Sequence, residues 1–430
     1  MIDGIGAFKG TARRPFLTPV AVLMAALAFR FVLLAWANPG IPVDGDTPSY
    51  LAIARSLAEG KGYSMDGAGP TAIRMPLYPF FLAGILSVPG TGVGTVLFVQ
   101  ILLDSITCLM AFFLARKLLD SLHAVVTGFL TALYLPCAYF SIVILSETLF
   151  CFLVTGSLLV LSFGDVKPRL TVLSGGIMGL AALTRPNGII VAGFVILWLA
   201  LFRRKPRQVI LYSLAVITFM TPWTVRNAIE FRHFIPTYSL NGITFYNSYV
   251  LPKKGYGFNS LQGVPENYHR LDNEGDRNAY LIRYTFHYIS EHPLSTAMSI
   301  PVKTALLVYP FDMKWLIPSS PFKYNVFWGA VFLLGCLGCA KRFRWMAERL
   351  SLLFFPLLSL CFTALLLYGS PRIRVPFDPL IAVIASVGLV WIWRRRDRIA
   401  WCVGMVAVHG FLAAAGSLST VSDILRRIMR

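Results

Sequence analysis

The chain has 430 residues, of which 56% are hydrophobic and only 14% are charged, and the apolar residues come in long uninterrupted blocks. This composition excludes a set of soluble domains and is typical of an integral membrane protein. The formal net charge is +19, but the basic residues lie in short gaps between apolar blocks and alternate with gaps poorer in Lys and Arg. That distribution is the positive-inside pattern of a multispanning protein, so nucleic-acid binding is not expected.

The apolar blocks predict a polytopic all-α membrane protein with a cytoplasmic N-terminus. Most blocks approach the roughly 20 residues that a bilayer requires. About eleven spans are expected, at residues 17–37, 93–115, 122–140, 144–163, 170–184, 187–202, 208–222, 325–340, 351–368, 377–393 and 399–416.

Three parts follow from these spans. An N-terminal transmembrane module (1–222) contains a first outer loop (38–92) that carries the chemistry. An extracytoplasmic loop region (223–324) includes a helix expected over 278–291 and an interfacial helix over 294–309. The remaining residues (325–430) form C-terminal transmembrane helices.

A polar island at residues 43–81 separates the first two apolar blocks. Asp44 and Asp46 stand at its entrance, and Thr47-Pro48 indicates a helix start with a hydroxyl capping residue and a proline in the first turn. Apolar residues over 50–58 recur at helical spacing. We therefore expect a short amphipathic helix on the membrane surface, whose dipole stabilises Asp46 as an anion. On spacing alone, the two aspartates could equally be simple helix caps.

Ionisable side chains within apolar blocks are costly and are therefore functional candidates. Glu147 lies a few residues into the fourth expected span, on the outer side, where it could face one cavity together with Asp46. An interfacial Glu in contact with headgroup water is the alternative. Arg185 and Arg226 stand at outer helix ends, where each would either touch ligand or snorkel to the interface.

A second outer cluster lies at residues 368–379, between two expected spans. Its Arg372 and Arg374 stand on the charge-poor face, so topology does not explain them. Guanidinium groups bind phosphate through bidentate, charge-assisted hydrogen bonds. Headgroup anchoring is the alternative. Lys303, inside the expected interfacial helix, is a further candidate for the same phosphate.

The polar island resembles the first extracytoplasmic loop of the GT-C glycosyltransferases, in particular the protein O-mannosyltransferase and lipid A aminoarabinose-transferase group. That loop reads Asp, three residues, Tyr, a short amphipathic helix, Gly-x-Gly, and then a basic residue before Pro and an aromatic. The matching residues are Asp46, Tyr50, Gly60-Lys61-Gly62-Tyr63, Arg74, Pro76, Tyr78 and Pro79. In most relatives a second acid directly follows the Asp. Here Thr47 takes that place and Asp44 lies two residues upstream, which leaves open which acid does the chemistry.

The resemblance implies a GT-C-type helical bundle with amphipathic helices in its first outer loop and a small extracytoplasmic region. It also implies transfer of a sugar from a polyprenyl-phosphate-linked donor to a lipid, glycan or protein hydroxyl, with inversion, on the extracytoplasmic side of a bacterial inner membrane. The implied roles are general base for Asp46 or Asp44 beside Glu147, donor phosphate binding for Arg372, Arg374, Lys303 and Arg226, and substrate binding for Tyr50, Arg74, Tyr78 and Arg185. No cofactor is required and no metal site is expected, although Asp44, Asp46 and Glu147 could hold a divalent cation.

Two other classes of membrane protein stay open. A lipid-linked oligosaccharide polymerase or ligase would also use outer arginines on a lipid phosphate, but it would not need the helix between Asp46 and Gly60. A transporter would place its charges near the bilayer midplane, on broken helices in related halves. The charges of this chain gather at one face, which argues against transport.

Overall fold

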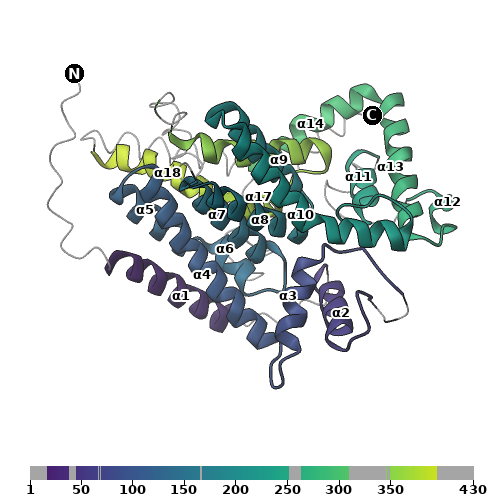
Figure 1. Cartoon of the computed structure of the whole chain (residues 1–430), viewed down its shortest axis with the longest axis horizontal. Coiled ribbons are helices and arrows are strands. Elements are labelled where there is room, and N and C mark those ends of the chain that lie inside the picture. Colours follow the sequence, from purple (N-terminus) through teal and green to yellow (C-terminus); the bar gives the residue numbers. More distant parts are fainter. Residues whose placement is uncertain are drawn as a thin grey trace.

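The computed structural model describes residues 17–37, 45–65, 67, 69–164, 167–250, 263–308, 345 and 349–394. These residues form helices joined by turns and contain no strand. Long apolar helices run along the molecule, and short polar helices gather at the end away from the N-terminus (Figure 1). The described part of the chain is therefore an all-α bundle with its polar elements at one end.

The N-terminal bundle is built from α1 (Leu17–Ala37), α4 (Val93–Leu118), α5 (Ser121–Ala132), α7 (Glu147–Ser162), α8 (Pro168–Thr184) and α10 (Pro206–Phe231). Glycines allow α8 and α10 to pack closely. A Cβ added at Gly175 would stand 2.7 Å from the carbonyl oxygen of Tyr212, and one at Gly179 would stand 3.1 Å from that of Val216. Small residues at helix crossings are the usual means of close packing inside a membrane.

The expected span at 122–140 is broken. Helix α5 ends at Ala132, and α6 (Leu135–Ser141) continues at an angle of 54°. Pro136 in the first turn of α6 explains the break, because proline lacks the N–H that a continuous helix would need there. The chain then turns again, so that Glu147 becomes the first residue of α7.

Five helices are long and apolar enough to cross a membrane, or six if α5 and α6 together form one span. Helix α9 (Asn187–Trp198) continues into η1 (Leu199–Arg203), and this segment and α7 are shorter apolar helices. The expected spans at 325–340 and 399–416 lie outside the described residues. The total of about eleven spans therefore stays a prediction, whereas a multi-pass membrane protein is confirmed.

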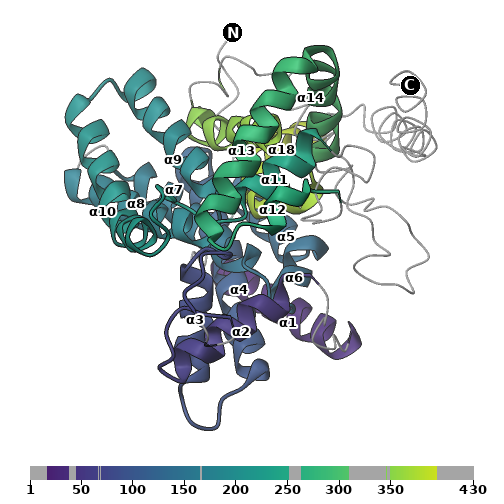
Figure 2. The same cartoon turned by 90° about the vertical axis from the view of Figure 1, so that its right-hand side faces the viewer.

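The segment between α1 and α4 contains α2 (Thr47–Ala58) and α3 (Leu77–Leu86), which pack against each other (Figure 2). Pro48 lies in the first turn of α2 as predicted, but the capping position belongs to Asp46 and not to Thr47. The Thr47 hydroxyl instead donates to the carbonyl of Ile144 at 3.0 Å. One face of α2 is buried, and the side chains of Tyr50 and Ile53 pack into the protein interior. Pro48, Arg55 and Ala58 are exposed, and the position of this helix on a membrane surface stays a prediction.

The boundary expected at residue 223, between the N-terminal membrane module and the extracytoplasmic region, stays a prediction. Helix α10 continues without interruption past residue 222 to Phe231. It is followed by α11 (Asn241–Tyr249), α12 (Glu266–His269), α13 (Glu274–Glu291) and α14 (Pro293–Val308). Helix α13 begins before the expected residue 278, because Asn273 caps it by accepting a hydrogen bond from Gly275 N–H at 2.6 Å.

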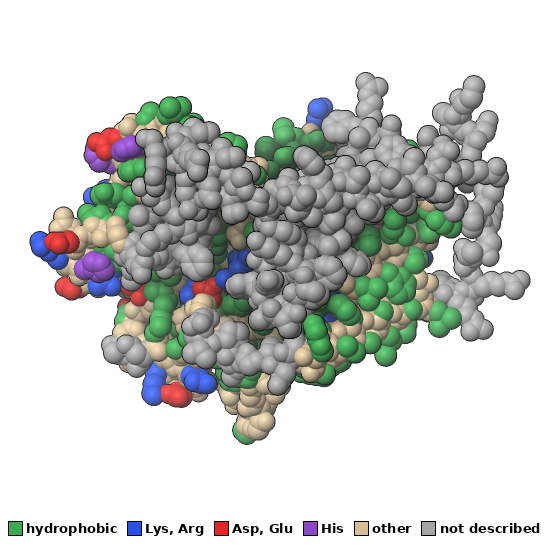
Figure 3. Space-filling model, turned by 180° about the vertical axis from the view of Figure 1, so that it is seen from behind, with side chains coloured by type: hydrophobic (Ala, Val, Ile, Leu, Met, Phe, Trp, Pro, Cys, Tyr) green, Lys and Arg blue, Asp and Glu red, His purple; other side chains and the backbone are tan. Residues whose placement is uncertain are grey.

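The C-terminal part comprises a helix at Arg349–Leu366, then α17 (Pro371–Arg374), η3 (Val375–Phe377) and α18 (Asp378–Arg394). Helix α18 packs against α5, and Phe377 meets Phe150 of α7 edge to face with ring centroids 5.9 Å apart. The short helix α17 is thereby held against the bundle beside the first turn of α7. On the face shown in Figure 3, the visible described part of the bundle is largely hydrophobic, and most of the charged side chains that can be seen lie towards the end with the polar helices.

Candidate active site

Asp46 stands at the start of α2 with its carboxylate turned away from the helix. Gly45 has a φ of +80°, a left-handed conformation that glycine adopts readily. The Asp46 side chain makes no capping hydrogen bond. Its Oδ1 instead lies 2.8 Å from Arg74 Nη1 and its Oδ2 lies 2.8 Å from Arg372 Nη2. The simple helix-cap reading of Asp46 is therefore wrong, because both oxygens pair with guanidinium groups.

Arg372 joins Asp46 to Glu147. Its Nε donates to Glu147 Oε1, while its Nη2 donates to Asp46. Arg372 belongs to the first turn of α17, where the hydroxyl of Ser370 caps the helix by accepting the Arg372 N–H at 3.2 Å. Glu147 begins α7, and a helix N-terminus favours a carboxylate there. Two carboxylates from distant elements thus share one guanidinium.

Arg185 completes this network of two acids and three arginines. Its Nη1 lies 2.7 Å from Glu147 Oε1 and 3.1 Å from the hydroxyl of Ser146. The Glu147 side chain is only 1% exposed, and its Oε2 has no hydrogen-bond partner in the described part of the chain. We call Asp46, Arg74, Glu147, Arg185 and Arg372 the acid–arginine network.

The charges of the acid–arginine network do not cancel. Three guanidinium groups face two carboxylates, which leaves one positive charge for an anionic ligand. Burial raises the pKa of the Asp46 carboxyl, but the nearby charges of Arg372 and Arg74 outweigh it and lower the pKa to about 2. Asp46 is therefore fully ionised at neutral pH and, while both arginines remain in place, is a weak proton acceptor.

Tyr50 and Tyr78, two tyrosines of the sequence motif, pack beside Arg74 of the acid–arginine network. The Arg74 guanidinium lies 5.2 Å from the ring centroid of Tyr50, which meets Tyr78 edge to face at 4.8 Å. Both rings are buried. The Tyr78 hydroxyl donates to Gln100 Oε1 at 2.7 Å, and the Gln100 amide donates to the carbonyl of Val143 at 2.7 Å. These contacts hold Tyr50 and Tyr78 against α4 and against the turn before α7.

Lys303 of α14 lies close to the same region. Its side chain is fully buried, and its Nζ sits 3.2 Å from the ring centroid of Tyr249 without a hydrogen-bond partner among the described residues. Gly369, just before α17, runs directly against the Lys303 backbone, so that any side chain at position 369 would collide with it. Burial lowers the pKa of Lys303 to about 7. An unpaired buried cation of this kind is suited to bind an anion.

Arg374 and Arg226 do not join the acid–arginine network. Arg374 Nε lies 3.1 Å from Asp378 Oδ1, and its Nη1 donates to the carbonyl of Leu307 at 2.7 Å. The Tyr134 hydroxyl occupies the other Asp378 oxygen at 2.7 Å. Arg226 donates to the carbonyl of Thr71 at 2.8 Å. Both arginines thus hold backbone segments near the site in the ligand-free protein.

Asp44 lies outside the described residues, so its position relative to Asp46 stays a prediction. Among the residues that the structure describes, no group of three or more His, Cys, Asp or Glu side chains is close enough to hold a metal ion. Asp46 and Glu147 are held together by Arg372 instead. A divalent cation at this site would have to displace that guanidinium.

Two polar features of the structure were not predicted. Glu274, the first residue of α13, accepts hydrogen bonds from the Thr71 hydroxyl at 2.6 Å, from Ala72 N–H at 2.9 Å and from the Ser239 hydroxyl at 2.6 Å. Glu274 thereby links residues 71–72, just before Arg74, to α13 by hydrogen bonds. No local sequence signal marks this contact, because its partners lie far apart along the chain.

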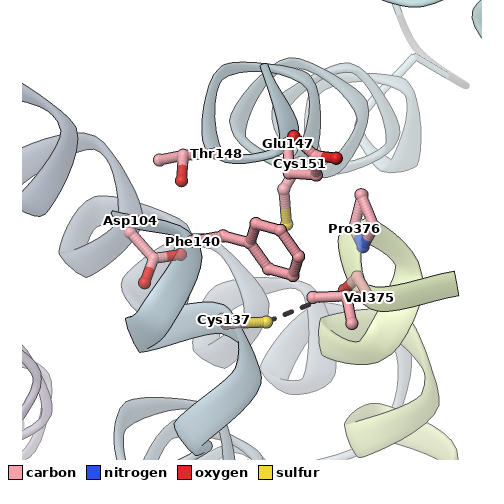
Figure 4. A pocket seen from close by; sticks show the side chains of 8 residues that line it. All are labelled: Asp104, Cys137, Phe140, Glu147, Thr148, Cys151, Val375 and Pro376. Carbon is pink, nitrogen blue, oxygen red and sulfur yellow. Dashed lines mark hydrogen bonds between the residues drawn. The ribbon is translucent and has the colours of Figure 1, made fainter. Parts of the chain in front are cut away.

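The second feature is an ion pair inside the bundle. Arg30 of α1 and Asp104 of α4 are 2.6 Å apart, and Arg30 also donates to the carbonyls of Ala26 and Ala132. Asp104 and Glu147 line opposite sides of a cavity of about 10 Å³, on the order of one water molecule (Figure 4). Both residues of the pair interrupt apolar blocks, so the rule that selected Glu147 would also have selected them.

Residues 70–225 match the family of dolichyl-phosphate-mannose-protein mannosyltransferases. This segment includes Arg74, Tyr78, Glu147 and Arg185, but neither Asp46 nor Arg372. No protein of curated function matches the chain in a sequence search.

Two solved structures resemble the fold. ArnT from Cupriavidus metallidurans bound to undecaprenyl phosphate has a TM-score of 0.54 and 15% identity, over 93% of this chain and 64% of that one. The oligosaccharyltransferase AglB from Archaeoglobus fulgidus, in complex with an inhibitory peptide and a dolichol-phosphate, has a TM-score of 0.50 and 17% identity, over 95% of this chain and 55% of that one. This chain thus spans little more than half the length of AglB.

The family match and the two structural likenesses agree with the motifs of the outer loop. The structural likenesses confirm the expected all-α membrane fold, and the match over residues 70–225 is a likeness of that segment to the mannosyltransferase family.

Proposed function

We propose that this protein transfers a sugar from a polyprenyl-phosphate carrier to an acceptor hydroxyl on the extracytoplasmic side of a bacterial inner membrane, with inversion at the anomeric carbon. The observation that carries the proposal is the position of Arg372 between Asp46 and Glu147. From that position the Arg372 guanidinium can bind the phosphate of an anionic donor, and it can also pair with Asp46, the carboxylate that would accept the proton. The bound undecaprenyl phosphate of ArnT and dolichol-phosphate of AglB support a lipid phosphate as the donor carrier.

The donor phosphate would bind to Arg372 and Lys303. The excess positive charge of the acid–arginine network attracts an anion, and a guanidinium binds phosphate oxygens in a planar fork. Lys303 Nζ has no hydrogen-bond partner in the described structure, so a phosphate oxygen would give it one. The same oxygen would raise the pKa of Lys303 and keep it charged. Arg374 and Arg226, which the motif also suggested, would contribute only if the donor displaced their backbone partners.

Asp46 would act as the general base after the donor has bound. As Arg372 turns towards the phosphate, Asp46 Oδ2 loses its cationic partner and the pKa of the carboxyl rises. Asp46 then accepts the proton of the acceptor hydroxyl while the hydroxyl oxygen attacks the anomeric carbon. The bond from the anomeric carbon to the phosphate oxygen breaks, and the phosphate leaves with the bonding electrons. A single displacement of this kind inverts the anomeric centre.

Arg74, Glu147 and Arg185 would hold the two reacting residues, Asp46 and Arg372, in place. Arg74 remains on Asp46 Oδ1 and keeps the carboxylate oriented. Glu147 pairs with Arg185, which lies 2.7 Å away, and provides the second carboxylate that limits how far Arg372 can move. Arg372 and Lys303 stabilise the negative charge of the departing phosphate, so a separate general acid is not needed. The scheme requires no divalent cation, because Arg372 and Lys303 would balance the charge of the departing phosphate while Arg74 stays on Asp46.

A purified preparation of the whole chain in lipid nanodiscs tests this function. Undecaprenyl phosphate carrying a radiolabelled hexose is supplied as the donor, and the release of undecaprenyl phosphate is followed with a mixture of sugar, lipid and peptide acceptors. We expect release above the protein-free control. Failure of the protein to bind undecaprenyl phosphate at all would overturn the proposal.

A further inference from the structure

Helix α11 (Asn241–Tyr249) turns one face towards α13. Ile243 and Tyr246 pack there with Leu281 and Tyr268 in a small hydrophobic cluster. None of the nine residues of α11 is charged. Its apolar face therefore explains why the helix docks on α13, but it does not explain the buried side chains of Asn247 and Ser248.

Helix α11 also carries buried polar groups. Thr244, Asn247 and Ser248 are 4%, 6% and 1% exposed. Both the amide nitrogen and the amide oxygen of Asn247 lack a hydrogen-bond partner in the described structure, and so does the Ser248 hydroxyl. Buried side-chain groups of this kind are almost always hydrogen-bonded, because leaving them unpaired is costly. Three such atoms on adjacent residues indicate that something binds them.

The first end of α11 lies beside the acid–arginine network. Ser239, just before the helix, donates its N–H to the carbonyl of Ala72 at 2.8 Å, and Ala72 is two residues from Arg74. The Tyr238 hydroxyl lies 3.0 Å from the Thr244 hydroxyl. Burial raises the pKa of Tyr238, and the charges of Arg74 and Asp46 also act on it, which agrees with this proximity.

The second end of α11 lies beside the residues proposed to bind phosphate. The Tyr249 hydroxyl donates to the carbonyl of Leu365, near the start of α17. Lys303 Nζ also lies over the Tyr249 ring, 3.2 Å from its centroid. Helix α11 therefore reaches from the segment that carries Arg74 to Lys303, and Asn247 and Ser248 stand near its Lys303 end.

We infer that Asn247 and Ser248 bind hydroxyl groups of the donor's sugar and that this sugar is uncharged. The inference rests on the proposed function, because a sugar attached to a phosphate at Lys303 and attacked beside Asp46 must lie between these two groups. A primary amide offers one acceptor and two donors, which match neighbouring sugar hydroxyls. An amino sugar or a uronic acid would need an opposite charge. Helix α11 has none, and the nearby acids Asp46 and Glu147 already pair with arginines, while the donor phosphate would take Lys303.

Binding to the purified whole chain in nanodiscs tests the inference with two kinds of lipid. Undecaprenyl phosphate reports the phosphate site alone, and undecaprenyl phosphate carrying mannose, glucose or 4-aminoarabinose adds the sugar. We expect at least one neutral hexose to bind at least tenfold more tightly than undecaprenyl phosphate. Asn247→Ala and Ser248→Ala should remove most of this gain and leave the affinity for undecaprenyl phosphate unchanged. Ser290→Ala, in the exposed part of α13, is the matched control.

A thermal unfolding measurement separates ligand binding from a structural role. Asn247→Leu removes an amide that has no hydrogen-bond partner among the described residues, so the ligand-free protein should keep or raise its Tm. A lower Tm would show that Asn247 has a structural partner and would contradict the inference. Equal affinity of every lipid in wild type and in both alanine variants would overturn it as well, and tighter binding of the 4-aminoarabinose lipid would refute an uncharged sugar. Absence of binding to undecaprenyl phosphate would instead reject the proposed function.

Discussion

The guanidinium of Arg372 holds the carboxylate of Asp46 at 2.8 Å, although the two residues are 326 positions apart in the chain. The same guanidinium also contacts Glu147 at the start of α7. A phosphate that attracts Arg372 must therefore compete with both acids. This competition links donor binding to the basicity of Asp46, because the cation that depresses its pKa is also the cation offered to the phosphate.

The first prediction concerns Arg372 as a ligand of the donor phosphate. Arg372→Ala should weaken the binding of undecaprenyl phosphate by about 1.5–3 kcal/mol, the range for hydrogen bonds to charged groups. Arg372→Lys should recover only part of this loss, because an ammonium keeps the charge but not the planar fork. Binding is measured in detergent, where no bilayer needs anchoring. Full recovery by lysine would indicate a headgroup anchor.

Arg374→Ala should act on stability. Its partner Asp378 is buried, and loss of one member of a buried ion pair costs on the order of 3 kcal/mol. We therefore expect a clearly lower Tm for Arg374→Ala and a smaller change for Arg372→Ala. The opposite order of Tm values would show that the two arginines exchange roles.

A third prediction uses the lowered pKa of Lys303. Its value of about 7 means that Lys303 loses its proton as the pH rises through neutrality in the ligand-free protein. Affinity for undecaprenyl phosphate should therefore fall between pH 6 and pH 8.5. Lys303→Arg should bind with a weaker pH dependence, because arginine stays charged. The ratio of the two affinities cancels the ionisation of the lipid itself, and a ratio that does not change with pH would exclude Lys303 from the phosphate site.

Acid should weaken the link between Asp46 and its arginines. The pKa of Asp46 is about 2 in the folded protein, against an ordinary value of 3.8. A depressed pKa stabilises the fold above the ordinary value, and the contribution is lost as the pH falls towards 2. Wild type should thus lose Tm between pH 4 and pH 2 more steeply than Asp46→Asn, which has no such proton to take up. Parallel curves would mean that the ion pairs do not stabilise the ligand-free protein.

The sidedness of the membrane gives a fifth prediction. Lys61 in the outer loop and Lys205 before α10 are both exposed. In a cysteine-free background, Lys61→Cys should react with a membrane-impermeant thiol reagent in intact cells, and Lys205→Cys should not. Labelling of Lys205→Cys alone would invert the topology and move the site to the cytoplasmic face.

The sequence indicated which residues the structure brings together better than it indicated which of their side chains touch. Asp46 and Arg74 lie in one recognisable motif, and the structure joins them directly. Arg372 and Arg374 looked equivalent because they share a motif. Only the rotation of a short helix and its packing on α14 decide which guanidinium reaches the acids, and such tertiary contacts leave no local pattern.

Other differences have equally specific causes. The contact between Glu274 and residues 71–72 depends on how α13 docks, so spacing alone could not reveal it. The buried polar atoms of Asn247 become visible only once their surroundings are known. The pair of Arg30 and Asp104, by contrast, could have been predicted, because both charges interrupt long apolar blocks.

The turnover of Asp46→Asn tests the central claim most directly. With saturating undecaprenyl phosphohexose, transfer should fall by at least about 100-fold, the lower bound for losing a general base. Its affinity for undecaprenyl phosphate should stay equal or become tighter, because Arg372 no longer has to leave the Asp46 carboxylate. Glu59→Gln, an exposed acid after α2, is the control and should transfer at the wild-type rate. Wild-type turnover in Asp46→Asn would contradict the account.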